Sequence, residues 1–72
     1  MRFRFTHHAQ SQALARSIDL SQIAETIRNS DTSSQAAAGA MLYRKKFKND
    51  ILEVICRRIR KNEYLVLTAY FL

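Results

Sequence analysis

The chain contains few of the residues on which stapled or metal-bound small folds depend. It is 72 residues long and has one cysteine, Cys56, and two histidines. A single cysteine excludes an internal disulfide, and so few cysteines and histidines leave a zinc site without enough ligands. We therefore interpret Cys56 as a small core residue. The absence of disulfides fits the reducing cytoplasm, where we expect the protein to reside.

Longer signatures are missing as well. No apolar run is long enough to cross a membrane, and the opening Met-Arg-Phe-Arg-Phe lacks the apolar core of a secretory signal. The chain has no glycine-rich phosphate loop, no nucleophilic-serine signature and no recognisable carboxylate pair of a glycosidase. We expect no metal, no cofactor and no membrane partner.

The positive charge is concentrated in one half of the chain. The net charge is +6, from 12 basic and six acidic residues. Residues 41–72 hold eight of the basic residues and three of the acidic ones, so this half carries about five of the six net charges. Such a surface suggests nucleic acid, an acidic protein or an anionic membrane as the partner. The alternative is that the charge serves only solubility, although its segregation argues against this.

The first half of the chain predicts one short strand and two helices. Residues 2–5 alternate polar and apolar side chains, as in a strand with one buried face. Thr6 is a favourable N-cap for a helix over residues 7–17, on which Ala9, Ala13 and Leu14 can face a core. Asp19 and Gln22 begin a second helix in a capping-box pattern, with an apolar stripe of Leu20, Ile23, Ala24 and Ile27.

The second half predicts a loop followed by three strands. Residues 29–34 are polar turn formers, and we interpret residues 35–40 as a loop leading into a strand. The strands are expected over residues 41–47, 51–60 and 64–72, separated by two tight turns. The prediction is a single α+β domain over residues 1–72, with the order β-α-α-β-β-β. Both helices would pack on one face of a mostly antiparallel four-stranded sheet.

Strand alternation predicts which side chains face away from the helices. Leu65, Leu67, Ala69 and Phe71 are assigned to the core, which turns Thr68 and Tyr70 outward. On residues 41–47 the outward residues are Arg44 and Lys46, with Lys45 near the rim. The middle strand has two registers, because a shift of one residue exchanges its faces. One register exposes Glu53, Ile55 and Arg57, and the other exposes Arg58 and Arg60.

The outward set has the chemistry of an RNA surface. Arginine binds phosphate through two nitrogens, lysine adds a point charge, and a tyrosine can stack on an unpaired base. We predict Arg44, Lys46, Arg57 and Tyr70 as site residues, with Lys45, Lys48, Arg58 and Arg60 as further RNA contacts. The alternative is that these are solvated residues that protect a sheet edge from aggregation.

The histidines stand at the start of the first helix. The positive end of the helix dipole disfavours a protonated imidazole there, which suits a general base or a donor to phosphate. His8, Gln12 and Arg16 form one polar stripe. His7 and His8 point about 100° apart on a helix and cannot readily share a metal ion. The alternative is a histidine that only caps or packs locally.

Several segments resemble a family of small bacterial domains, domain of unknown function 4258. The family pattern T-x-H-A-x-x-R-M-x-x-R-x-I is similar to residues 6–18, and residues 43–47, 52–55 and 67–70 are similar to the family's strands. His8 matches the histidine of the pattern and Arg16 its second arginine. Gln12 replaces the first arginine, Ala13 the methionine and Ser17 a frequent glycine.

The resemblance implies the fold of RelE-like and BrnT-like toxins, which are ribonucleases or translation inhibitors paired with an antitoxin. The predicted function is thus a metal-independent endoribonuclease or translation inhibitor of a bacterial toxin–antitoxin system. His8 would move protons, Arg16, Arg44, Lys46 and Arg57 would steady phosphate, and Tyr70 would orient or stack. Glu53 is an alternative base. A non-enzymatic RNA-binding or protein-interaction domain would use the same face.

This function implies two kinds of partner. The first is RNA, including messenger RNA on the ribosome, and the second is an antitoxin protein. The chain also ends within its last predicted strand. We therefore expect a partner or a second copy in a homodimer to cover that edge.

Overall fold

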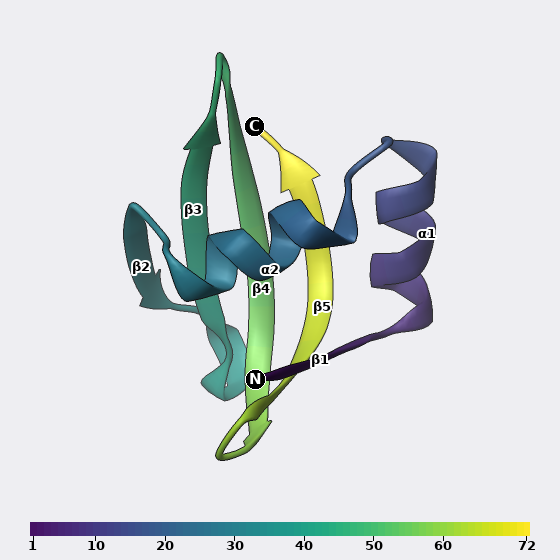
Figure 1. Cartoon of the computed structure of the whole chain (residues 1–72). Coiled ribbons are helices and arrows are strands. Elements are labelled where there is room, and N and C mark those ends of the chain that lie inside the picture. The colour runs from purple at the N-terminus through teal and green to yellow at the C-terminus, as the bar shows by residue number, and fades with distance from the viewer.

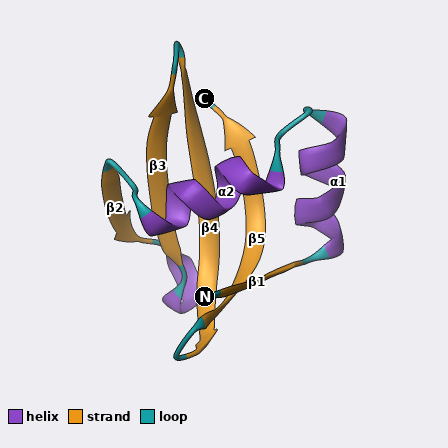
Figure 2. Cartoon of the chain, in the orientation of Figure 1, coloured by secondary structure: helices purple, strands orange, loops and turns teal.

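A computed structural model describes all 72 residues and contains two helices, a short 3-10 helix and five strands (Figure 2). In chain order these elements are β1 Arg2–Phe5, α1 His7–Ala15, α2 Leu20–Arg28, β2 Thr32–Gln35, η1 Ala37–Gly39, β3 Met41–Phe47, β4 Asp50–Arg60 and β5 Glu63–Phe71. None of the helices is both long and apolar enough to cross a membrane.

The strands form one mixed sheet in the order β1-β5-β4-β3-β2. Only the β1–β5 pair is parallel, and the other three pairs are antiparallel. α2 crosses β3 and β4 on one face of the sheet, while α1 stands beside β5 (Figure 1). The predicted α+β class and the two helices on one face are therefore confirmed.

The sheet has five strands, so the prediction of four was wrong. The additional strand is β2, in a stretch that was expected to be loop. All four of its residues are exposed, so it has no apolar alternation to reveal it. Pairing with β3 creates it: Thr32 lies opposite Arg44 and Gln35 opposite Met41, and the Asp31 N–H donates to the Arg44 carbonyl at 2.8 Å.

The core lies between the sheet and the two helices. Ala9 and Ala13 of α1 and Ile23 and Ile27 of α2 pack on buried residues of β4 and β5: Leu52, Val54, Cys56, Val66 and Ala69. Small residues on α1 allow the helix to approach β5 closely. Leu14 was expected to face this core but is 86% exposed, because one residue of helix turns it about 100° from Ala13.

A β-bulge changes the faces along β5. Ile55 pairs with Thr68, but the next residue, Cys56, pairs with Val66, so Leu67 is extra. Ala69 and Phe71, after the bulge, face the helices as predicted. Leu65, before the bulge, pairs with Arg57 on the opposite face, so its assignment to the core was wrong. Val66 takes the buried position instead.

β5 lies inside the sheet, but β1 covers only its first part, and no strand pairs with its end on the side away from β4. One side of it pairs with β4, and the other pairs with β1 over residues 63–66. Beyond that point Thr6 and Gln12 bind its backbone. The Thr6 hydroxyl donates to the Leu67 carbonyl at 3.2 Å, and the Ala69 N–H donates to Gln12 Oε1 at 3.0 Å.

Candidate nucleic-acid interface

The face of the sheet opposite the helices, called the open face below, carries six basic side chains. The pairing registers place on it Arg44 and Lys46 of β3, Arg57 and Arg60 of β4, and Arg2 and Arg4 of β1. Two glutamates share this face, Glu53 and Glu63, and both are buried. The open face therefore combines exposed cations with carboxylates that are shielded from solvent.

At one end of the open face, Glu53 binds two neighbours across the strands. Arg44, Glu53 and Tyr70 lie side by side in the registers of β3, β4 and β5. Arg44 Nε donates to Glu53 Oε1 at 2.7 Å, and the Tyr70 hydroxyl donates to Glu53 Oε2. Because the bond uses only Nε, the terminal nitrogens of the half-exposed Arg44 side chain are left for a ligand.

Toward the other end, Glu63 binds two arginines. Arg4 Nε lies 2.5 Å from Glu63 Oε2, and Arg60 Nε lies 3.5 Å from Oε1. The arginine side chains are 69% and 80% exposed, whereas that of Glu63 is 7% exposed. Sequence reasoning did not include Arg4 or Glu63 in the site. The alternation of residues 2–5 was the available signal, since it sets Arg4 and Phe5 on opposite faces of the sheet.

The strand registers separate the predicted contacts into two groups. Arg57 lies on the open face opposite Leu65, and its Nη2 donates to the Ala38 carbonyl at 2.8 Å. Arg58 pairs with Tyr64 on the helix side, so the structure selects Arg57 of the two registers. Arg60 returns to the open face because of a second register shift after Arg58.

Lys45 and Lys48 are not part of the open face. Lys45 Nζ donates to the Asn29 carbonyl at 2.9 Å, on the helix side of β3. Lys48 occupies the turn between β3 and β4 with a φ of 55°. These two lysines and Arg58 lie outside the open face, although all three were predicted from the sequence to contact RNA.

The polar stripe of α1 borders the open face through Gln12. Its Oε1 accepts from the hydroxyl of Thr68, which pairs with Ile55 on that face. His8 and Arg16 lie one helical turn to either side of Gln12 and are exposed. β3 and β5 are about 10 Å apart across β4, and α1 lies beyond β5. His8 and Arg44 therefore cannot contact the same phosphate, and the catalytic group predicted from the sequence is not assembled at one point.

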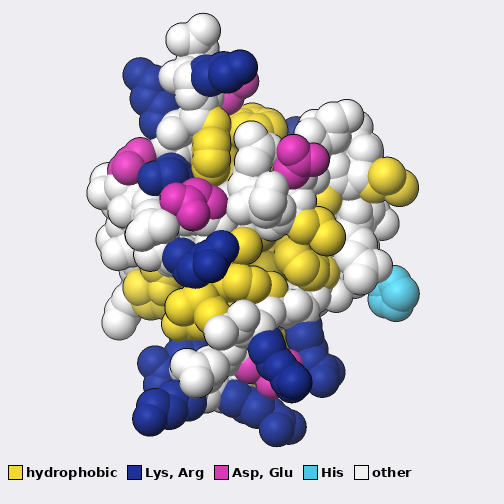
Figure 3. Space-filling model, in the orientation of Figure 1, with side chains coloured by type: hydrophobic (Ala, Val, Ile, Leu, Met, Phe, Trp, Pro, Cys, Tyr) yellow, Lys and Arg dark blue, Asp and Glu magenta, His cyan; other side chains and the backbone are white.

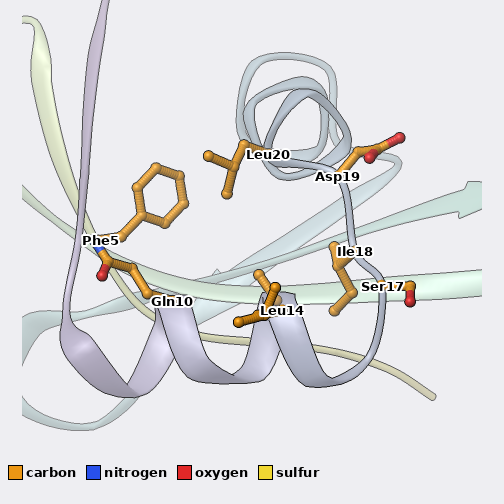
Figure 4. Close-up of a pocket in the computed structure, with 8 residues that line it drawn as sticks. Phe5, Gln10, Leu14, Ser17, Ile18, Asp19 and Leu20 are labelled. Carbon is orange, nitrogen blue, oxygen red and sulfur yellow. The ribbon is translucent and has the colours of Figure 1, made fainter.

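Other surfaces carry less directed chemistry. A groove of about 480 Å³ lies between α1 and α2, where Leu14, Leu20 and Phe5 are prominent and no basic residue lines it (Figure 4). On the helix-covered side, hydrophobic side chains show between α2 and the lower end of the sheet, and basic side chains gather at both ends (Figure 3). No cluster of three or more His, Cys, Asp or Glu side chains could hold a metal ion.

Comparison with known proteins gives one match. The model of the family described as "Domain of unknown function (DUF4258)" matches residues 5–71, nearly the whole chain. No curated protein and no solved structure matches.

Proposed function

Because the chain belongs to the DUF4258 family, and because its open face is basic, we propose that it is a toxin-like domain that binds RNA. The arrangement of Arg44, Glu53 and Tyr70 carries this proposal. The buried carboxylate fixes a guanidinium and a phenol ring next to each other, facing solvent. An arginine for phosphate beside an aromatic ring for a base is a combination typical of single-strand recognition.

The position of Glu53 argues for binding rather than proton transfer at this point. Both of its oxygens already accept hydrogen bonds, one from Arg44 and one from Tyr70. A carboxylate held in this way orients its partners, and at 3% exposure it offers the 2′-hydroxyl of RNA little access. Glu53 is therefore a positioning residue, and the alternative in which it acts as the general base is not favoured.

Neighbouring lysines on opposite faces provide a direct test. Lys46→Ala removes a cation from the open face and is expected to weaken binding of single-stranded RNA about three- to ten-fold at low salt. Lys45→Ala removes the same charge from the helix side and should change affinity less than about two-fold. Fluorescence anisotropy over a salt series measures both variants, and the salt slope should fall only for Lys46→Ala. Equal effects from the two lysines would show that only the net charge matters.

RNA cleavage is the second candidate, and the place of His8 favours it. His8 is exposed where α1 meets the open face, so a strand that crosses β5 would pass beside it. In such a reaction a base removes the proton of a 2′-hydroxyl, and O2′ bonds to phosphorus. The bond from phosphorus to O5′ then breaks, and O5′ takes a proton, which leaves a cyclic phosphate.

Inducible expression in bacteria tests this candidate. A ribonuclease should arrest growth and degrade RNA. His8→Ala should lower the rate of cleavage by about a hundred-fold or more, while the affinity for RNA changes less than about two-fold. Intact RNA and normal growth with the unaltered protein would leave binding as the function. His7→Ala, at the adjacent exposed position, is the matched control.

A toxin function also implies a protein partner and a location in the cell. We propose an antitoxin that relieves the growth arrest when it is co-expressed, and a cytoplasmic location where RNA and ribosomes are accessible. The element order of two helices followed by consecutive antiparallel strands supports the RelE- or BrnT-like toxin fold that the resemblance implies.

A further inference from the structure

We propose that Arg4, Glu63 and Arg60 form a second phosphate subsite, so that the open face binds an extended single-stranded RNA along β4 and β5. This inference rests on the proposed RNA binding and specifies which RNA the face would take. The open face would then bind one extended strand at two separate clusters, rather than a single nucleotide in a pocket.

The two ends of the open face share one construction. At each end a buried glutamate binds arginine through Nε: Arg44 on Glu53, and Arg4 and Arg60 on Glu63. An Nε contact leaves both terminal nitrogens of the guanidinium for another acceptor, and the arginine side chains are 47–80% exposed. Phosphate oxygens accept two such N–H groups at once. Each cluster is thus a donor group whose orientation is fixed before a ligand arrives.

The spacing of the clusters sets the length of the ligand. Glu63 and the Tyr70 that binds Glu53 lie seven residues apart on β5, a distance of roughly 20 Å at about 3.3 Å per residue. That distance corresponds to about six phosphates of a stacked strand at roughly 3.4 Å each. A nucleic acid that contacts both clusters must therefore be an oligonucleotide.

The surface between the clusters suits unpaired bases. It is formed by Leu42, Ile55, Leu65 and Thr68, which are half-buried, and it is bordered by Gln12 of α1 and by Ala38 of η1. Apolar side chains can support the flat faces of bases that are exposed in a single strand but enclosed within a duplex. Phosphate contacts at the two ends and base contacts between them favour single-stranded RNA over an acidic protein.

The experiment compares a trinucleotide with a nonanucleotide of uridine, using fluorescence anisotropy at low salt. The unaltered protein should bind the nonanucleotide at least about ten-fold more tightly, because only the longer probe contacts both clusters. Glu63→Gln should weaken nonanucleotide binding about five-fold and leave trinucleotide binding within two-fold, although it removes a negative charge. Glu25→Gln, which removes a negative charge from α2, should change neither.

A second variant keeps the test valid if Glu63→Gln does not fold. Arg60→Ala leaves Glu63 paired with Arg4 and should weaken only the nonanucleotide, whereas Lys61→Ala in the adjacent turn should not. Unchanged or tighter nonanucleotide binding by folded Glu63→Gln or by Arg60→Ala would show that the cluster around Glu63 only stabilises the sheet. Competition by polyglutamate as strong as by RNA would assign the face to an acidic protein instead. If the unaltered protein binds neither probe, the proposed RNA binding itself fails.

Discussion

Replacing Glu53 with glutamine is expected to weaken binding of single-stranded RNA by about ten-fold, which is the affinity lost with one or two oriented charge-assisted contacts. The direction of this effect is diagnostic. The substitution raises the net charge from +6 to +7, so attraction of RNA by charge alone predicts tighter binding. A decrease can arise only if the carboxylate holds its neighbours in position.

The physical reason lies in the two hydrogen bonds that Glu53 accepts. Glutamine keeps one acceptor oxygen but carries no charge, so the bond that Arg44 Nε donates to it is weaker than the bond to the carboxylate. Its amide nitrogen can only donate, so the Tyr70 hydroxyl must turn to accept in place of donating. Both side chains are then held less firmly, and ordering them again opposes RNA binding.

Two controls isolate the role of Glu53. Tyr70→Phe retains the ring and removes the hydroxyl, so it should retain most stacking and lose less affinity than Glu53→Gln. Glu25→Gln makes the same charge change on the helix side and should leave affinity within about two-fold. Circular dichroism confirms that each variant is folded. Tighter RNA binding by folded Glu53→Gln would contradict the proposed site.

The second large effect is expected in alkaline solution and depends on Cys56. This residue is 1% exposed, and burial raises the pKa of its thiol from 9.0 to about 11. The unfolded chain therefore loses the thiol proton at lower pH than the folded protein. The stability that Cys56 contributes is complete below pH 9 and is lost as the pH rises toward about 11. The loss amounts to about 3 kcal/mol.

Urea denaturation between pH 8 and pH 11 measures this loss. Cys56→Ala removes the thiol, so its free energy of unfolding should fall less steeply over this range, even though the variant starts from a lower value at neutral pH. Burial and the neighbouring Cys56 raise the pKa of Tyr43, so Cys56→Ala also lowers the Tyr43 contribution, and the comparison measures the two coupled groups together. Parallel curves for the two proteins would show that Cys56 does not ionise differently in the folded state.

Local patterns predicted most of the elements. The capping residues Thr6 and Asp19 mark the starts of α1 and α2, and the Ala9 N–H donates to the Thr6 hydroxyl at 3.1 Å. Apolar alternation placed β3, β4 and β5 within a residue or two of their observed bounds. These features depend on neighbouring residues in the chain, so the sequence contains the information needed to find them.

The errors occur where distant segments decide the structure. β2 forms because β3 offers an unpaired edge, not because its Thr-Ser-Ser-Gln sequence favours a strand. The bulge at Leu67 reverses the face of Leu65, and strand alternation cannot place a bulge. Gln12 stands where the family pattern has an arginine, so the sequence alone suggested only a missing positive charge. In the structure its side-chain oxygen accepts the N–H of Ala69, 57 residues away in the chain.

The sequence by itself determined the α+β class, the two helices on one face and a basic outer surface, because alternation, capping and charge are local properties. Alternation also set Arg44 and Lys46 outward, but only the tertiary structure decided between the two registers of β4. It turned Arg57 outward and Arg58 toward the helices. It also brought Arg44, Glu53 and Tyr70 together from three strands, and Arg4 to Glu63 from opposite ends of the chain. Register and strand order set these contacts, and both depend on packing of the whole domain.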